Sequence, residues 1–297
     1  MPCYRPQQAY RSTERSDNGK WSVTFSPKQG YVDYGVKLPC GQCIGCRLEK
    51  SRQWAIRCVH EMQEHEENSF ITLTFDEKNI DPTGSLVKAD FQKFMKRLRK
   101  NTGRKIRYFH CGEYGDQLKR PHHHAILFGY DFNDKKQIQD SHKGCTQYES
   151  ETLNKAWQHK GLATIGDANF ETAAYVARYV LKKMNGVGAD NYYQGKQPEY
   201  ITMSRGGKGG KGIGHSFYDK YKEETYRDDN VVIRGKQMKP PKYYDDQLDK
   251  ENPALLEEIK LNRFKNAQAS EDFDNLTRLH VKELITELRQ KTQTRTL

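Results

Sequence analysis

The feature that most constrains this chain is a histidine cluster that runs into an apolar strand. Residues 121–128 read Pro-His-His-His-Ala-Ile-Leu-Phe. Side chains alternate between the two faces of a β-strand, so His122 and His124 point to one face while His123 points to the other. Two imidazoles on one face at the head of a strand provide half of a metal site. A cluster of surface histidines on an edge strand is the alternative interpretation.

A second strand candidate lies just upstream, at residues 107–113, and ends in Glu113. The polar, turn-prone residues 114–120 separate the two strands and predict a β-hairpin. Such a hairpin brings Glu113 beside the histidines. Two imidazoles and a carboxylate suit Mg²⁺, Mn²⁺ or a similar divalent ion. The candidate metal ligands are therefore Glu113, His122 and His124.

Residues 170–184 form a helix candidate, because they include three alanines and no glycine or proline. Tyr175 and Tyr179 are four residues apart, so they share one face of that helix. Arg178 follows the first tyrosine by three residues, and Lys182 follows the second at the same offset. This repeat indicates a nucleophile with a supporting cation. Two core tyrosines on an amphipathic helix are the alternative.

Together these motifs resemble the HUH endonucleases, which nick single-stranded DNA during rolling-circle replication. The three family motifs match, in order, the apolar strand with threonine at 70–75, the pair His122 and His124 with Glu113 before it, and Tyr175 with Tyr179. One departure is His123, since the family usually has a bulky apolar residue there. Because that side chain faces away from the candidate metal ligands, the departure concerns packing more than chemistry.

The spacing of the two tyrosines is similar to that of the two-tyrosine replication initiators of small single-stranded DNA bacteriophages. Within that group, residues 40–47 (CGQCIGCR) and 111–115 (CGEYG) look like the gokushovirus branch of the microviruses. The resemblance extends from about Pro39 to Gly214. It implies an α+β HUH endonuclease fold, with a central antiparallel β-sheet, flanking helices and the tyrosine helix packed near the metal site.

The resemblance also implies a replication initiator that nicks the viral origin by metal-assisted attack of a tyrosine. Mg²⁺ or Mn²⁺ would act as a Lewis acid on the scissile phosphate, and Arg178 or Lys182 would support the phenol or the transition state. The products are a 5′-phosphotyrosine and a free 3′-hydroxyl primer, and the second tyrosine rejoins ends. An HUH relaxase or transposase shares this chemistry, and a non-enzymatic DNA-binding protein with a cysteine metal site is a third alternative.

The charge of the chain agrees with a nucleic-acid partner. Lysine and arginine total 50 against 39 acidic residues, a net charge of +11, which favours binding to phosphates. The expected partners are the single-stranded DNA origin and host replication proteins such as a helicase and a polymerase. The sequence contains no apolar run of membrane length and no signal-peptide pattern, so we expect a protein of the host bacterial cytoplasm with no membrane partner.

Seven cysteines without an export signal indicate reduced thiols or metal ligands rather than disulfides. Cys40, Cys43 and Cys46 form a C-x2-C-x2-C run that could hold a structural zinc ion. The fourth ligand of such a site has three candidates, which are Cys3, Cys58 and His60. An iron-sulfur cluster and three free thiols near a helix start are the alternatives.

We expect three parts along the chain. These are a cysteine-containing element and helix at 1–66, the endonuclease core at 67–204, and a basic glycine-rich loop with a mainly helical region at 205–297. Further expected elements are helices at 47–65, 151–159 and 253–292, a helix with Asp90 as its N-cap, and an edge strand at 163–166. The glycine-rich run 204–214 either contacts phosphates or is a connector.

Overall fold

A computed structural model of the chain describes residues 3–15, 21–115, 118–140, 146–182, 188–206, 211–268 and 276–293. The side chains of 21, 139–140, 179–182, 267–268 and 293 lie outside this description. The chain forms two compact units: a large unit, Lys50–Leu261, and a small unit that joins Met1–Glu49 to Asn262–Leu297. The three-part division expected from the sequence stays a prediction, because the compact units follow proximity in space.

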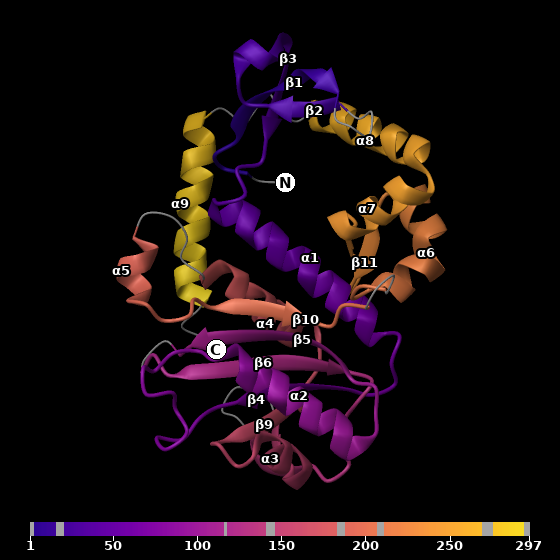
Figure 1. Cartoon of the computed structure of the whole chain (residues 1–297). Coiled ribbons are helices and arrows are strands. Elements are labelled where there is room, and N and C mark those ends of the chain that lie inside the picture. Colours follow the sequence, from indigo (N-terminus) through magenta and orange to yellow (C-terminus); the bar gives the residue numbers. More distant parts are fainter. Residues whose placement is uncertain are drawn as a thin grey trace. The chain divides into compact units, whose positions relative to one another are not determined.

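The large unit is built on an antiparallel sheet whose strand order, within the described residues, is β10-β5-β6-β4-β9-β8-β7 (Figure 1). Its strands are β4 (Asn68–Leu73), β5 (Arg107–Tyr114), β6 (Pro121–Phe128), β7 (Lys136–Asp140), β8 (Thr146–Glu149), β9 (Ala163–Asp167) and β10 (Tyr200–Met203). Helices flank this sheet, so the predicted α+β fold with a central antiparallel sheet is confirmed.

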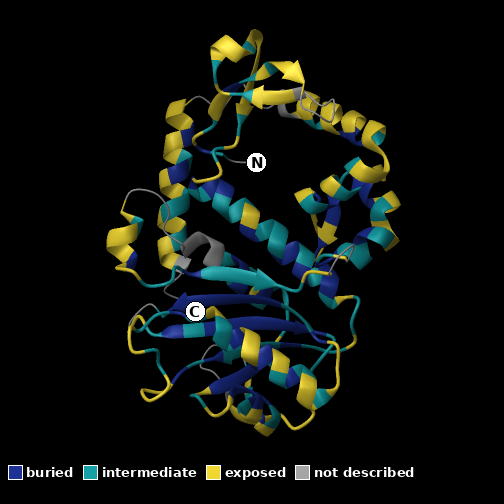
Figure 2. Cartoon of the chain, in the orientation of Figure 1, coloured by how far each residue is buried: buried dark blue, intermediate teal, exposed yellow. Residues whose placement is uncertain are grey.

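Helices cover both faces of the sheet. On one face lie α2 (Lys88–Thr102) and α3 (Glu151–Trp157), whose aromatic side chains pack against alternate residues of β4 and β6. The other face is covered by α4 (Phe170–Lys182) and by the Lys50–Met62 part of α1 (Ile44–Met62). Figure 2 shows β5 and β6 buried along most of their length. The predicted strand pair therefore lies at the centre of the core.

The expected hairpin of β5 and β6 is present. Its antiparallel register sets Glu113 opposite His122 and Cys111 opposite His124. His124 lies on the α1/α4 side with Ile126 and Phe128, because side chains alternate along the strand. The hairpin thus carries the candidate ligands on the face that the tyrosine helix covers.

The remaining described elements of the large unit follow the tyrosine helix. They are α5 (Ala189–Tyr193), α6 (His215–Arg227), the hairpin of β11 (Val231–Ile233) and β12 (Lys236–Met238), α7 (Lys242–Glu251) and the first part of α8 (Pro253–Gln268). Tyrosine and aliphatic side chains from α6, α7 and α8 form a separate apolar cluster. The helical character expected for the chain after Pro253 is confirmed.

The small unit contains the sheet β2-β1-β3, formed by β1 (Gln7–Arg15), β2 (Trp21–Thr24) and β3 (Gly30–Leu38), with the short 3-10 helix η1 (Pro27–Gln29). Most described side chains of this sheet are exposed (Figure 2). The N-terminal segment is tied to α9 (Leu276–Gln293), because Arg5 Nε donates to Glu283 Oε2 at 2.8 Å. The unit therefore depends on both ends of the chain.

Two local predictions were wrong. The strand expected at an edge, β9, lies between β4 and β8, and its Ile165 is buried. Asp90 is not the N-cap of α2, since that helix begins at Lys88 after Val87. Asp90 instead lies in the first turn, where its Oδ1 accepts a hydrogen bond from Lys160 Nζ at 2.7 Å. The position of β9 follows from its backbone pairing with both β4 and β8.

Among the helices that the structure describes, none has the length and apolar character that crossing a membrane requires.

A buried histidine on α1 makes the large unit sensitive to acid. His60 stacks on Phe217 with ring centroids 3.5 Å apart, and burial lowers its pKa to about 3. In the unfolded chain this histidine has a pKa of roughly 6.5. Below that pH the unfolded chain binds a proton at this position and the folded chain does not, so the free energy of unfolding falls by about 1.4 kcal/mol for each pH unit.

We predict that His60→Phe flattens the fall in unfolding free energy between about pH 6.5 and about pH 5 by roughly 1.4 kcal/mol per pH unit. Urea unfolding at several pH values measures this slope. His159→Asn is the matched control, because His159 is exposed, and it should leave the slope of the parent protein unchanged. An equal slope in His60→Phe and the parent protein would contradict the assignment.

Candidate metal and nucleophile site

The two histidines at the head of β6 are each anchored through Nδ1. His122 Nδ1 lies 2.7 Å from the carbonyl oxygen of Arg120, so this nitrogen carries the proton and donates it. His124 Nδ1 lies 3.0 Å from Thr72 Oγ1 on β4. A second partner at Nδ1 orients an imidazole and leaves Nε2 for a metal ion, as is usual for histidine ligands. The hydrogen bonds at Nδ1 therefore orient both imidazoles in the way that binding a divalent cation through Nε2 requires.

Glu113 completes the candidate ligand set. Its Oε1 lies 2.8 Å from His124 Nε2, and both side chains are buried. Two neighbouring ligands of an octahedral ion at about 2.1 Å lie about 3.0 Å apart, so this spacing suits a shared cation. His122 lies further from His124 than Glu113 does, because the ring centroids of the two histidines are 6.2 Å apart. Glu113 and His124 are therefore brought together, whereas the ligand atoms of Glu113, His122 and His124 do not all lie within 4.8 Å of one another.

The phenol of Tyr175 lies next to this pair. Its hydroxyl donates a hydrogen bond to Glu113 Oε1 at 3.4 Å, and its ring meets the His124 ring edge-on at a centroid distance of 5.1 Å. The ring of Phe70 on β4 packs against both His124 and Tyr175. A candidate nucleophile and two candidate ligands from three different elements thus share one face of the sheet.

Local structure fixes the position of α4. Asn169 and Thr172 cap its start reciprocally, because Asn169 Oδ1 accepts from Thr172 N and Thr172 Oγ1 accepts from Asn169 N, each at 2.9 Å. Ala173, Val176 and Ala177 are buried against the sheet. These small and branched side chains bring the helix close, which lets Tyr175 reach the edge of the site.

The other predicted catalytic residues lie further along α4. Arg178 is half-buried, one turn after Tyr175. Tyr179 and Lys182 belong to the helix, but their side chains lie outside the described residues. The part of the glycine-rich run at 207–210 also lies outside them. The roles expected for these residues stay predictions.

His123 faces the α2/α3 side, as the alternation along β6 predicts. Its Nδ1 lies 3.1 Å from His110 Nε2, and the two rings are surrounded by aromatic side chains, including Phe91. Burial lowers the pKa of His123 to about 3, so the ring is neutral. The departure from an apolar residue is therefore accommodated by a second buried histidine.

Two glycines near the site allow close approaches that the sequence did not reveal. A Cβ at Gly115 would lie 2.9 Å from His122 Cε1, and a Cβ at Gly112 would lie 2.9 Å from the Tyr200 ring. Both are closer than side-chain carbons normally come. The CGEYG run at 111–115 therefore has a steric reason for its glycines, and Gly115 leaves room for the ring of His122.

A basic groove of about 600 Å³ lies at the other end of β5. Six cationic residues line it, and these are Arg99, Arg104, Lys105, Arg107, Arg205 and Lys211. Several have partners, such as Glu67 for Arg104 and Glu61 for Arg107. Among the described residues, neither Lys105 nor Arg205 forms an ion pair. The groove keeps an excess of positive charge.

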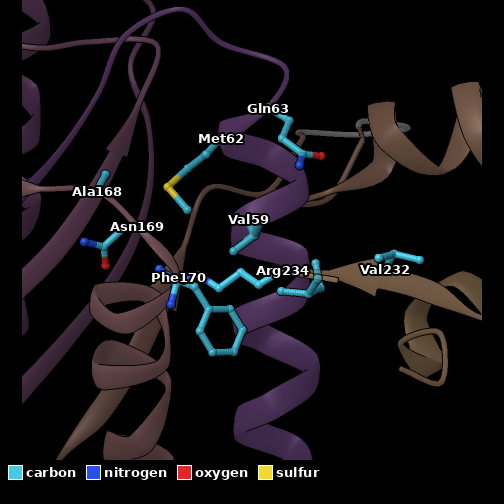
Figure 3. A pocket seen from close by; sticks show the side chains of 9 residues that line it. Val59, Met62, Gln63, Ala168, Asn169, Phe170, Val232 and Arg234 are labelled. Atoms are coloured by element: carbon cyan, nitrogen blue, oxygen red, sulfur yellow. The ribbon is translucent and has the colours of Figure 1, made fainter. Parts of the chain in front are cut away.

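A second pocket, of about 300 Å³, lies beside the start of α4. Figure 3 shows Val59 of α1, Phe170 of α4 and Arg234 of the β11–β12 hairpin around it. Arg234 also forms a two-pronged ion pair with Glu171. None of the candidate ligands lines this pocket, so its walls serve to hold α4 rather than to complete the site.

Comparison with known proteins points to one family. The sequence model of the family described as "Replication-associated protein ORF2/G2P" matches residues 68–184. The chain is 32% identical over 290 residues to "Replication-associated protein ORF2" of Spiroplasma virus 4, covering 90% of this chain and 87% of the relative.

Two further relatives agree. The chain is 33% identical over 264 residues to "Replication-associated protein VP4" of Bdellovibrio phage phiMH2K, covering 85% of this chain and 79% of the relative. It is 28% identical over 256 residues to "Replication-associated protein ORF4" of Chlamydia phage 1, with coverage of 82% and 62%. No solved structure matches the chain significantly.

The close approach at Gly115 gives a test of the ligand set. We predict that Gly115→Ala displaces the His122 ring and weakens Mn²⁺ binding by about 10-fold or more, as outer contacts of metal ligands typically do. Isothermal titration calorimetry with Mn²⁺ measures the affinity. Gly166→Ala on β9 is the matched control, because its Cβ meets only Phe70 at an ordinary 3.5 Å. Equal Mn²⁺ affinity in the two variants would remove His122 from the ligand set.

Proposed function

Because the chain belongs to the microvirus-type family of phage replication-associated proteins, we propose that it starts rolling-circle replication by nicking single-stranded origin DNA through a tyrosine. The observation that supports this most directly is the hydrogen bond from the Tyr175 hydroxyl to Glu113 Oε1, beside the ring of His124. A phenol in contact with a histidine–carboxylate pair is the arrangement that attack on a phosphodiester needs.

The chemistry follows from these contacts. The Tyr175 oxygen attacks the scissile phosphorus, the bond from phosphorus to O3′ breaks, and O3′ takes a proton from water to become a free 3′-hydroxyl. Since the phenol donates to Glu113 Oε1, that carboxylate holds the phenol beside the site, and the phenol proton passes to water during the attack. A divalent cation held by Glu113, His122 and His124, with Mg²⁺ and Mn²⁺ as candidates, would neutralise charge on the phosphate.

The second tyrosine extends the reaction from nicking to closure. Tyr179 follows Tyr175 by four residues on α4, the spacing at which helical residues are neighbours on one face. One tyrosine holds the 5′ end while the other cleaves the regenerated origin, and Arg178 and Lys182 support the phenols. The free 3′ end is a primer for a host polymerase working with a helicase in the host cytoplasm.

The basic groove gives the DNA backbone a path to this site. Arg107 lines the groove and stands six residues before Glu113 on β5, which is about 20 Å along an extended strand. Cations at that distance attract phosphates without approaching the reacting atoms. We therefore assign the groove to backbone contacts rather than to chemistry.

We predict that incubation with a labelled origin oligonucleotide and Mn²⁺ yields a covalent protein–DNA adduct. Tyr175→Phe should reduce nicking strongly, and Tyr179→Phe should reduce it at least as much, because Tyr179 with Lys182 has the Tyr-x-x-Lys form of the single-tyrosine proteins that the sequence resembles. Tyr192→Phe, at an exposed tyrosine of α5, is the matched control. Adduct formation is read on a denaturing gel, and the modified residue is mapped by mass spectrometry.

The outcomes separate the possibilities. If the parent protein forms no adduct in the presence of metal, the nicking proposal is contradicted and a non-enzymatic DNA-binding protein is favoured. Full nicking by Tyr179→Phe would overturn the ranking of the tyrosines. Glu113→Gln should lose nicking while keeping DNA binding, since it removes a charge from the site and leaves the groove intact.

The groove has its own test. We predict that the double variant Lys105→Glu with Arg205→Glu weakens binding to single-stranded oligonucleotides and lowers the slope of log affinity against log salt by about 1.4, or about 0.7 per lost phosphate contact. Fluorescence anisotropy over a range of salt concentrations measures both. Lys93→Glu, on the exposed face of α2, is the matched control. An unchanged salt slope would exclude the groove from the DNA path.

A further inference from the structure

We propose that Cys3, Cys40, Cys43 and Cys46 bind one structural zinc ion in the small unit. The four sulfur atoms lie within 4.8 Å of one another, and Cys43 Sγ is 3.9 Å from Cys3 Sγ. In a tetrahedral zinc site with Zn–S bonds of about 2.3 Å, two sulfurs lie about 3.8 Å apart. The cluster therefore has the dimensions of a four-cysteine site for a single ion.

The backbone conformation around the cluster brings the cysteines together and favours their thiolate form. Gly41 has a φ of 72°, a left-handed conformation that glycine adopts readily, and it turns the chain between Cys40 and Cys43. Arg47 N donates to Cys43 O at 3.1 Å, so Cys43 stands at the start of α1 and Cys46 lies in its first turn. The partial positive charge of a helix start favours thiolates.

Backbone amides support three of the four sulfurs. Cys40 N donates to Cys3 Sγ at 3.2 Å, Cys43 N to Cys40 Sγ at 3.3 Å, and Tyr4 N to Cys43 Sγ at 3.4 Å. Such outer contacts orient metal ligands and stabilise their negative charge. Four uncharged thiols would gain little from so many donors, whereas zinc-bound thiolates gain from each.

The structure also selects among the ligands that the sequence left open. Cys58 is buried against the sheet of the large unit, and His60 Nδ1 lies 2.8 Å from Tyr244 Oη, so both have other roles. Cys3 is the fourth ligand. An iron-sulfur cluster attaches its cysteines to different iron atoms and so spreads the sulfurs further apart than a single ion does. The tight spacing favours one ion.

The small unit needs such a link because it buries few apolar side chains. The described apolar cluster of this unit contains Tyr4 and Leu279 besides the buried cysteines and their neighbours. Small units with limited cores commonly depend on disulfides or a metal ion for stability. Zinc would join the N-terminal segment, the turn at Gly41 and the first turn of α1.

The test is metal analysis of the purified full-length chain. It is carried out in a His122→Ala background, so that the candidate catalytic site adds little to the measured metal content. We expect about one zinc per chain, and we expect Cys3→Ser and Cys40→Ser to lose it. Cys58→Ala is the matched control and should retain the zinc, since Cys58 is a buried free cysteine outside the cluster.

A spectroscopic measurement keeps the proposal testable if the serine variants fail to fold. Replacing zinc with Co²⁺ in the parent chain should give thiolate-to-cobalt charge transfer and the intense visible bands of a tetrahedral sulfur site. Folded protein without zinc, stoichiometric iron in its place, zinc retention by both serine variants, or cobalt bands of an octahedral oxygen site would each overturn the proposal.

Discussion

The pairing register of β5 and β6 is the constraint on which the site depends. It sets Glu113 opposite His122 and directs both toward α4. A slip of one residue would turn the histidine pair to the α2/α3 side and bring His123 to the α4 side. Burial on both faces prevents this slip, because Ile126 packs on one side and Leu127 on the other. The apolar residues at the end of β6 thus fix the face on which the candidate ligands at its beginning lie.

The parts of the site that the sequence predicted are those encoded by local periodicity. Alternation along a strand was enough to separate His123 from its neighbours, and helical periodicity was enough to place Tyr175 and Tyr179 on one helix, α4. The hydrogen bond between Thr72 and His124 could not be predicted in this way, because it joins residues 52 positions apart in the chain. The room that Gly115 leaves for His122 is likewise a property of the folded hairpin, and the sequence shows only a glycine after a strand.

The errors and omissions have a related cause. The segment at 163–166 was predicted at an edge, and the strand that flanks it in the sheet, β8, is short, with alternating intermediate and exposed residues that give little apolar signal. The sheet of the small unit was not predicted, since its strands are exposed and lack the alternation that burial imposes. The cysteine run was visible and Cys3 was one of three candidates for a fourth ligand, but only folding shows that the Cys3 sulfur lies within 4.8 Å of the other three. Long-range partners, rather than local preference, decide these features.

The two ends of the chain meet in the small unit, where Arg5 pairs with Glu283 and Tyr4 with Thr286. A ribosome delivers the first of these residues long before the last, and domains generally fold as they emerge. The large unit is continuous in sequence, so it can acquire its sheet while synthesis continues. The small unit can be completed only when α9 has been made. Prematurely terminated chains would therefore have a folded central sheet and an unfinished N-terminal segment, which a protease could recognise as a mark of incomplete translation.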